Sequence, residues 1–496
     1  MSCWCILFFL LVASIASVSY GVRQTIQDVS AQGTAASSAS AKSGPDRSTS
    51  STDCTGPQSA LPKGSTRVYI ALRNSVDGAG KTASDARDGS TAERFDSILR
   101  CYAEGCPDKS VAKTEKLTVC IGPGVFQTKG NYDFLMNTPH PSQQGFTVGK
   151  GWKIHGSGVA QTTLQLSAYR TASAAKDPEL LPAGTGAGVV FSTNSDSASG
   201  IEISDLTIDA NYSKLKALAR QQGVRALNLQ AIHLRSDEGG HWIHNVNVIN
   251  TSGEIGGMDI RFETFPVWIY SVHPNSTPAQ NSGSIIEHIN MSQFRGGACT
   301  AIAVANAVAE VRNNSVDGYQ IGYGGWSMGP VWFHDNVATS TDYGFNIDSL
   351  NNEGVRIESN QIIGPRKYGF VIGGGGTYAN FRISHNTIQI KDTGAIGILF
   401  QGNVTKASVL GNILLSSSRN ALAIKNFSAN RQTGPNQNNV YQANHIDGSL
   451  KIVFSEPSQP SQNCMFGNVD EKGNRRKDLP DNRDTPCVDE AAPARK

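Results

Sequence analysis

Two short segments carry ionisable residues at every second position, the spacing that places side chains on one face of a β-strand. They read AIHLRSD at 231–237 and MDIRFE at 258–263. Registering Ile232 with Met258 turns the apolar residues of both segments inward and stacks the other residues in outward pairs. The predicted pairs are His233 with Asp259, Arg235 with Arg261, and Asp237 with Glu263.

These pairs suit the cleavage of a polysaccharide if the two strands are neighbours, about 5 Å apart. A carboxylate beside His233 orients the imidazole and raises its basicity for proton transfer. Two carboxyl groups at that spacing match a retaining glycosidase. Stacked Arg235 and Arg261 need an anion between them, either the neighbouring carboxylates or the carboxylate of a uronic acid. The six residues are therefore predicted as a catalytic centre, with elimination by His233 and hydrolysis by Asp237 and Glu263 both open.

Three further residues are predicted to contact the sugar. Tyr323 and Trp326, in GYGGWSMG, can stack on a pyranose face or instead pack under the next loop. Asp348, at the end of GFNID (344–348), is predicted to point outward. The alternative for the ionisable patch is a solvated outer face, which discourages lateral association. That alternative corresponds to a non-catalytic surface, adhesion or glycan-binding protein.

The elements that must position these residues repeat along the chain. Each repeat has a phrase of apolar residues around a central Asn, such as ISHNTI at 383–388. The central residues are Asn314, Asn336, Asn360, Asn386, Asn412 and Asn444. Each period also contains an alternating phrase, such as GFVIG at 369–373, which predicts a short strand. This spacing indicates a solenoid, propeller or array, and neither leucine-rich repeats nor propeller blades match the frame or the period.

The fold class that fits best is all-β, a right-handed parallel β-helix with a small mixed N-terminal cap. In such a coil the same turn recurs on every rung, and an inward Asn can bond backbone groups and the Asn of the next rung. The competing explanation is that Asn is a common turn residue. Four histidines lie in turns or beside the Asn positions and are interpreted as structural: His155, His334, His385 and His445.

The chain from about 67 to 455 resembles the pectin-lyase-like superfamily of right-handed β-helix proteins. The resemblance rests on the Asn phrases, on ISDLTIDA at 203–210 and on VCIGPGVFQT at 119–128. It implies a secreted polysaccharide lyase, glycoside hydrolase, epimerase, fructan transferase, phage tailspike or surface adhesin, with the site in a groove along one strand face. The Asn-Thr-Asp and Gly-His-Gly marks of polygalacturonases are absent, as is the Trp-Ile-Asp-His phrase of pectate lyases. The resemblance therefore carries over no site residue.

Composition narrows the partners. The 496 residues are 17% charged and 39% hydrophobic, as in a globular chain with a large core. A net charge of +2 gives no support to nucleic-acid binding. A polysaccharide or oligosaccharide is the predicted partner, and the sequence leaves a homo-oligomer open. No cofactor or metal is predicted, and no motif indicates calcium, although calcium stays open.

The ends of the chain differ from its middle. The apolar run ILFFLLVASIA at 6–16 predicts a cleaved export signal rather than an uncleaved anchor, and no later segment is apolar enough to span a bilayer. A secreted or cell-surface location follows. The predicted division is signal peptide at 1–20, linker at 21–60, N-terminal cap at 61–130, β-helix at 131–455 and tail at 456–496.

Export permits disulfides. The spacing predicts bridges among four cysteines near the cap: Cys54, Cys101, Cys106 and Cys120. It also predicts a staple between Cys464 and Cys487, with Cys299 free.

Overall fold

The structure is a computed structural model. It describes residues 52–55, 64–72, 87–106, 113, 116–131, 145–171, 184–193, 197–253, 264–271, 283–292, 300–326, 331–348, 352–418, 420–427, 436–454 and 463–478. Within these ranges the side chains of 326, 352, 353 and 374–377 are not described.

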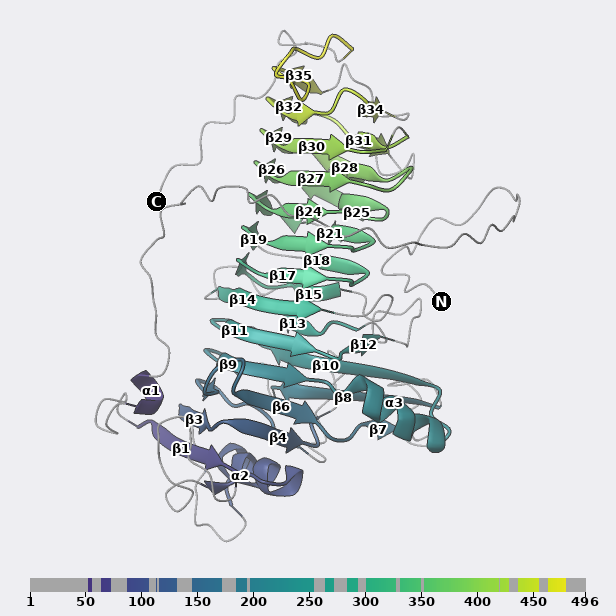
Figure 1. Cartoon of the computed structure of the whole chain (residues 1–496). Helices are drawn as coiled ribbons and strands as arrows, with labels where there is room; N and C mark the ends of the chain where they lie inside the picture. The colour runs from purple at the N-terminus through teal and green to yellow at the C-terminus, as the bar shows by residue number, and fades with distance from the viewer. Residues whose placement is uncertain are drawn as a thin grey trace.

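The strands stack into one right-handed parallel coil that runs from α2 at one end to β35 at the other (Figure 1). Most turns of the coil contribute one strand to each of three faces, so the predicted fold class is confirmed. Face A is the 13-stranded sheet. Faces B and C are the two halves of the 22-stranded sheet, before and after the Asn-containing turn.

Face A contains the strands β7 Arg170–Thr171, β8 Thr185–Ser192, β10 Ala226–Arg235, β12 Ser252–Gly253, β13 Val267–Tyr270, β15 Thr300–Ala305, β18 Ile321–Trp326, β21 Tyr343–Ile347, β22 Asn352–Glu353, β25 Tyr368–Ala379, β28 Ile396–Thr405, β31 Leu422–Phe427 and β34 Lys451–Phe454. Face B contains β1 Thr66–Ala71, β2 Arg87–Asp88, β3 Leu117–Ile121, β5 Lys153–His155, β16 Ala309–Arg312, β19 Val331–His334, β23 Arg356–Glu358, β26 Arg382–Ser384, β29 Ser408–Leu410, β32 Val440–Gln442 and β35 Cys464–Phe466. Face C contains β4 Gly124–Thr128, β6 Thr162–Leu166, β17 Ser315–Asp317, β20 Val337–Thr339, β24 Gln361–Ile363, β27 Thr387–Ile390, β30 Ile413–Ser416 and β33 His445–Ile446. Three strands bend through both B and C: β9 Glu202–Asp209, β11 Trp242–Ile249 and β14 Ser284–Ser292.

The core lies inside the coil because alternate residues of every face point inward. On face A, Phe345, Phe370 and Ile398 are aligned in register and fully buried, as the alternating phrases predict. On face B, Val311 and Phe333 are likewise buried and aligned. Each inward residue therefore stacks on its counterpart in the next turn, and the residues between them point outward.

The repeated Asn residues form a buried ladder at the turn between faces B and C. The Nδ2 of Asn360 donates to Oδ1 of Asn386 at 3.0 Å and to the carbonyl of Phe333 at 3.0 Å. The backbone N–H of Asn360 donates to the same Oδ1 at 2.9 Å. The ladder also includes Asn468, which the sequence pattern did not include. The predicted stacking of Asn amides is confirmed, so these residues are more than common turn formers.

The residue before each ladder Asn makes the turn tight. Asp335 and Ser359 occupy the left-handed region, with φ of 55° and 57°. A single left-handed residue bends the chain sharply from face B to face C, and the following Asn points inward. The turn therefore has the same geometry on every rung that carries it.

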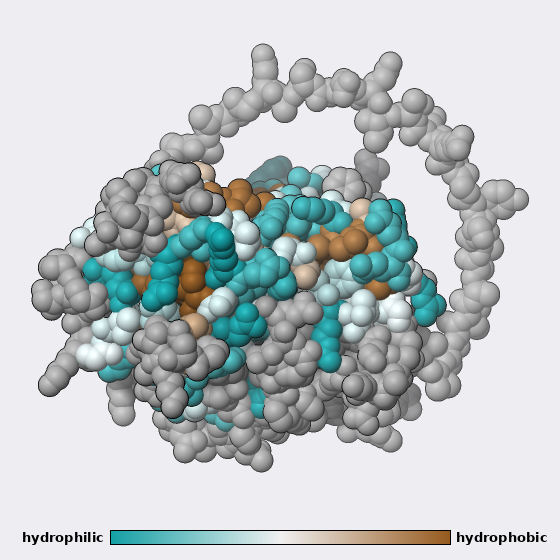
Figure 2. Space-filling view, turned by 90° about the horizontal axis from the view of Figure 1, so that it is seen from below, coloured by the Kyte–Doolittle hydropathy of each residue, from teal (hydrophilic) through white to brown (hydrophobic). Residues whose placement is uncertain are grey.

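Both ends of the coil are covered. Helix α2 (Ala92–Glu104) packs on β4 and buries Phe95, and Asp96 accepts hydrogen bonds from the Thr128 hydroxyl at 2.5 Å and the Lys129 N–H at 2.8 Å. Seen from this end, the described surface is mainly hydrophilic with smaller hydrophobic areas (Figure 2). At the other end the Arg476 guanidinium donates to three backbone carbonyls, those of Ile446, Asp447 and Leu450. Covered ends remove the open edges on which another chain could add strands.

Disulfides tie the first end of the coil. The structure contains the bonds Cys54–Cys120 and Cys101–Cys106, as predicted for this group of cysteines. Cys464 is also disulfide-bonded, while its predicted partner Cys487 and the predicted free Cys299 lie outside the described residues.

Some sequence predictions concern residues that the structure does not describe, and the structure contains a helix that the sequence did not predict. The signal peptide at 1–20 and most of the linker at 21–60 lie outside the described residues, although α1 (Thr52–Thr55) falls at the linker's end. Helix α3 (Tyr212–Gln221) was not predicted. None of the helices in the described ranges combines the length and the apolar character needed to cross a bilayer.

The ladder predicts a large effect for Asn360→Ala. The substitution leaves the N–H groups of Asn336 without their acceptor and the carbonyl of Phe333 without a donor. Unpaired buried polar groups cost about 1–3 kcal/mol each, so we expect a loss of about 2–4 kcal/mol in unfolding free energy. Thermal and guanidinium unfolding measure it. Gln361→Ala, at the exposed next residue, is the matched control, and an equal loss in both variants would contradict a role for the ladder.

Candidate functional site on the outer face of the coil

The predicted catalytic register is wrong, because β10 pairs with β13 and not with the segment at 258–263. The pairing aligns Ile232 with Val267 and His233 with Trp268. The other edge of β10 pairs with β8 at these residues, so no third neighbour can be accommodated. The segment VWIY at 267–270 occupies this position, and its pairing with β10 buries Val267 fully in the coil. His233 thus has both of its strand neighbours and cannot pair in register with Asp259, and Asp259, Arg261 and Glu263 lie outside the described residues.

His233 and its neighbours are not on an open surface. The imidazole is fully buried and stacks on the Trp268 ring at 4.4 Å, with the Tyr270 ring 4.9 Å away. Arg235 is buried, and Asp237 accepts a hydrogen bond of 2.6 Å from the Ser271 hydroxyl. This part of face A is therefore an aromatic cluster rather than an exposed ionisable patch.

Tyr323 packs inside the coil, so the prediction that it stacks on a sugar is wrong. Its ring lies 4.9 Å from that of Phe345, and its hydroxyl donates to the carbonyls of Asn314 and Val337 at 2.9 Å each. The reason is register, since Tyr323 pairs with the inward Phe345. The side chain of Trp326 lies outside the described part of the chain.

Asp348 is buried rather than exposed at the end of β21. It accepts a hydrogen bond of 3.2 Å from the hydroxyl of Tyr378, a core residue. Burial raises the pKa of Asp348 to about 7. The outward, exposed position predicted for Asp348 is therefore wrong.

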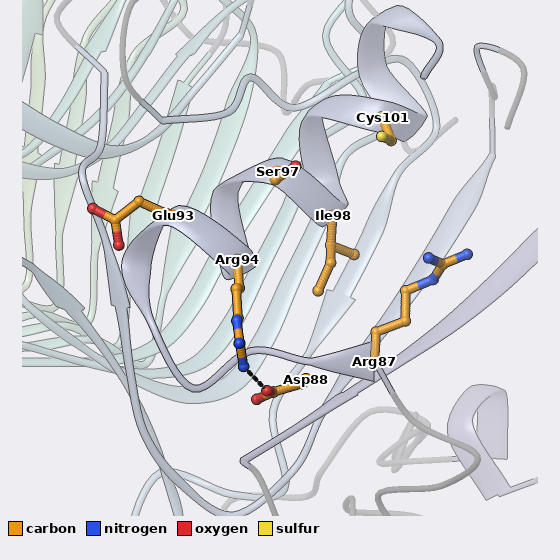
Figure 3. Close-up of a pocket in the computed structure, with 7 residues that line it drawn as sticks. All are labelled: Arg87, Asp88, Glu93, Arg94, Ser97, Ile98 and Cys101. Atoms are coloured by element: carbon orange, nitrogen blue, oxygen red, sulfur yellow. Dashed lines mark hydrogen bonds and ion pairs between the residues drawn. The ribbon is translucent and has the colours of Figure 1, made fainter. Parts of the chain in front are cut away.

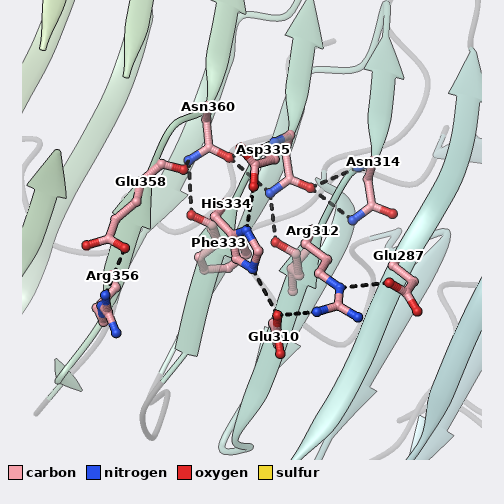
Figure 4. A network of polar contacts seen from close by, with 12 residues as sticks. Glu287, Glu310, Arg312, Asn314, Phe333, His334, Asp335, Arg356, Glu358 and Asn360 are labelled. Atoms are coloured by element: carbon pink, nitrogen blue, oxygen red, sulfur yellow. Dashed lines mark hydrogen bonds and ion pairs between the residues drawn. The ribbon is translucent and has the colours of Figure 1, made fainter. Parts of the chain in front are cut away.

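One group of ionisable and aromatic residues in the described chain gathers instead on the outside of face B. We call them the outer-face network; it consists of Trp242, Glu287, Glu310, Arg312, Trp332, His334 and Asp335. Figure 4 shows the central part, where side chains from β14, β16 and β19 reach across neighbouring rungs. Alternation explains their position, because Val311 and Phe333 between them point inward.

His334 lies between two carboxylates. Its Nε2 is 2.9 Å from Glu310 Oε1, and its Nδ1 is 2.7 Å from Asp335 Oδ2. Ionised carboxylates only accept hydrogen bonds, so both ring nitrogens must carry a proton for both bonds to form. The geometry therefore favours the imidazolium.

Arg312 joins the same group to the previous rung. Its Nε donates to Glu287 Oε2 and its Nη1 to Glu310 Oε1, each at 2.7 Å. The indole N–H of Trp242 donates to the other oxygen of Glu287 at 2.7 Å. One guanidinium and one imidazolium thus face three carboxylates, those of Glu287, Glu310 and Asp335.

These contacts shift the pKa values in opposite directions. Burial alone would lower the pKa of His334, but its hydrogen bonds to Glu310 and Asp335 outweigh burial and raise the pKa above its ordinary value of 6.5. The hydrogen bond from His334 is the largest cause that lowers the pKa of Glu310. Burial would raise the pKa of Glu287, yet the bonds from Arg312 and Trp242 lower it. The pairing therefore favours the ionised form of both glutamates and the protonated form of His334.

Two indole rings stand on the same surface, both partly exposed. Trp332 stacks on His334 with ring centroids 3.9 Å apart. The guanidinium carbon of Arg356 also lies over the Trp332 ring, 4.6 Å from its centroid. Trp242 stacks on His244 at 3.9 Å. Strand pairing places Trp242 and Trp332 in one row, three rungs or roughly 14 Å apart.

Towards the N-terminal end, the row continues with a buried acid. Glu202 Oε1 is 3.3 Å from His244 Nε2 and 3.9 Å from His155 Nε2, and Oε2 is 3.4 Å from Lys153 Nζ. Burial would raise the pKa of Glu202, but the neighbouring imidazoles and Lys153 lower it. In the residues that the structure describes, no group of three His, Cys, Asp or Glu side chains is arranged to hold a metal ion.

A separate pocket of about 510 Å³ lies beside α2 and is shown in Figure 3. Arg87, Asp88, Arg94 and Glu93 supply its charges, and Arg94 is paired with Asp88. Glu93 is paired with Lys129 at 3.0 Å. Three of these four charged groups are thus already engaged within the cap, and we assign no chemistry to this pocket.

The sequence pattern missed the outer-face network because His334 was interpreted as structural. A signal was present, since the two outward residues of each face B strand precede the ladder Asn by four and two positions. Glu310 and Arg312 stand in those places before Asn314, and Trp332 and His334 stand there before Asn336. Aligning the repeats on their Asn residues would have shown two columns of charged and aromatic side chains.

The comparisons with known proteins agree on architecture only. No protein-family model and no curated protein matches the chain. Among solved structures, the chain is similar to the mannuronan C-5 epimerase AlgE6 A-module of Azotobacter vinelandii, with 13% identity, 75% of this chain and 94% of that one covered, and a TM-score of 0.42. It is also similar to an exopolygalacturonase from Thermotoga maritima (12% identity, 71% and 83% covered, TM-score 0.41).

A third similar structure is PfbA, a surface adhesin of Streptococcus pneumoniae, with 10% identity, 77% and 88% covered, and a TM-score of 0.41. The resemblance to β-helix proteins predicted from the sequence is confirmed at the level of the fold. At these scores the likenesses say nothing about which ligand this chain binds.

The geometry of His334 predicts a pH dependence of stability. Because the folded pKa is raised, its contribution is fully present below the unfolded value of 6.5 and is lost as pH rises through the folded pKa. We expect the difference in unfolding midpoint between the wild type and His334→Gln to be largest at acidic pH and to shrink at alkaline pH. His445→Gln removes an exposed imidazole and serves as the control. A difference that grows with pH would contradict the proposed imidazolium.

Proposed function

We propose that this chain is a carbohydrate-active β-helix protein that binds a linear polysaccharide along the outer-face network. The observation that carries the proposal is the row of partly exposed indoles interleaved with paired charged groups on regularly spaced rungs. Aromatic faces suit the apolar faces of pyranose rings, and charged groups held in fixed geometry suit hydroxyl groups. A polymer can follow such a row because the coil repeats along one axis.

A binding role is supported by the pairing of the carboxylates. Glu287 and Glu310 each bond Arg312, and Glu310 also bonds His334. Neither carboxylate is therefore a free nucleophile, and neither has the raised pKa of a carboxylic general acid. A secreted or surface location, proposed from the apolar run at 6–16, would place this face in contact with extracellular glycans.

Polysaccharide cleavage is a second candidate, and His334 favours it. Its hydrogen bonds to the carboxylates of Glu310 and Asp335 favour the protonated ring and raise the pKa of His334. In hydrolysis the imidazolium would give this proton to the leaving oxygen as the glycosidic bond breaks, and a water molecule would add to the anomeric carbon and return a proton to the imidazole. Glu310 would hold the ring in place, and an ionised carboxylate would stabilise the positive charge that develops on the sugar.

Binding predicts a specific effect of Trp332→Ala. Losing the stacking surface should weaken polysaccharide binding by about 1 kcal/mol, or roughly fivefold in Kd, with the fold intact. Affinity electrophoresis against a panel of neutral and acidic polysaccharides measures it. Phe427→Ala removes an exposed ring from face A and is the matched control. If no polysaccharide binds the wild type, or if both variants bind alike, this face is not the binding site.

Cleavage predicts a different result for His334→Gln. Removing a general acid should slow release of new reducing ends by about a hundredfold or more, while binding changes far less. Reducing-end and unsaturated-bond assays on the same polymers separate hydrolysis from elimination. A wild type that binds a polymer but forms neither product would leave binding as the function and remove the catalytic candidate.

A further inference from the structure

Two guanidinium groups stand on adjacent rungs beyond the outer-face network. Strand pairing aligns Arg356 of β23 with Arg382 of β26, and their side chains are 46% and 37% exposed. In the same row, the rung before them carries Trp332 and the rung after them carries Ser408. The two cations are therefore neighbours on an accessible part of face B.

One carboxylate serves both of these cations. Glu358 Oε2 is 2.9 Å from Arg356 Nη2, and Glu358 Oε1 is 2.8 Å from Arg382 Nε. Both oxygens of Glu358 are thus engaged by different guanidinium groups. Among the described residues no other carboxylate pairs with either Arg, so one positive charge is left uncompensated.

The contrast with Arg312 makes this excess informative. Arg312 is bonded by Glu287 and Glu310 together, so its charge is fully balanced on the same face. If face B were only a solvated mosaic of charges, the same local balance would be expected two rungs further on. Instead the surface changes from two cations with three acids, counting His334 and Asp335, to two cations with one acid.

Hydrogen-bond donors are also in excess there. A guanidinium offers several N–H donors, and the contacts to Glu358 use only some of those on Arg356 and Arg382. The buried indole N–H of Trp332, whose ring lies under Arg356, has no acceptor among the described residues. Donors and positive charge thus converge where acceptors are lacking.

We propose that Arg356, Arg382 and Trp332 form a subsite for an anionic group of the bound polysaccharide, either a carboxylate or a sulfate ester. This inference rests on the proposed function, because it names the class of polymer that the outer face takes. The planar guanidinium edges can bond an oxyanion bidentately, while the indole supports the sugar ring that carries it. The ligand would supply the second negative charge that the pair of cations lacks.

Three variants test the subsite by affinity electrophoresis with polygalacturonate, dextran sulfate and neutral dextran. Replacing both Arg356 and Arg382 by Gln keeps most of the packing and should weaken binding of an anionic polymer about tenfold or more. Glu358→Gln should strengthen it several-fold, because both cations are released for the ligand. Arg366→Ala, which removes a partly exposed cation paired with Asp342 elsewhere, should change little.

The sign of the Glu358→Gln effect separates recognition from a structural role, since a structural ion pair would make this variant bind more weakly. Preference for polygalacturonate or for dextran sulfate identifies a carboxylate or a sulfate as the group. One outcome would overturn the anionic subsite and leave the proposed function standing. In it, the wild type and the three variants bind dextran equally, and Trp332→Ala binds it more weakly. Absence of binding to every polymer would overturn both.

Discussion

Hydrogen bonding between buried Asn side chains is the constraint on which the rest of the molecule depends. Each amide accepts from the rung before it and donates to the rung after it and to a backbone carbonyl. A slip of one residue would leave these groups unpaired in the core and would turn every side chain of the strand to the opposite face. The ladder therefore fixes the register of faces B and C together.

A fixed register turns sequence repeats into surface columns. Because the ladder Asn occupies one position on each rung, the residues two and four positions earlier come to lie in two outward rows on face B. Side chains of neighbouring rungs meet in these rows although more than 20 residues separate them in the sequence. Arg312 contacts Glu287, and His334 contacts Glu310. The chemistry of face B is a consequence of the same periodicity that builds the core.

Charge balance divides this surface into two parts. Around Arg312 and His334, every cation is paired with two carboxylates, and the pKa shifts favour the ionised forms. Around Arg356 and Arg382 the balance is incomplete. The two parts of face B therefore differ in charge, with carboxylates in excess around His334 and cations in excess around Arg382.

The sequence by itself determined the architecture, because the Asn phrases and the alternating strands are local patterns and each copy reports the same turn. It could not determine which strand follows β10 on face A, since MDIRFE and VWIY both have the alternation that a strand needs. Only the tertiary structure decided this in favour of Val267 and Ile269, which pack into the core. The same holds for His334, whose role depends on carboxylates supplied by a neighbouring rung and by the turn beside it. Contacts between rungs depend on the path and length of the connecting loops, and no local pattern encodes them.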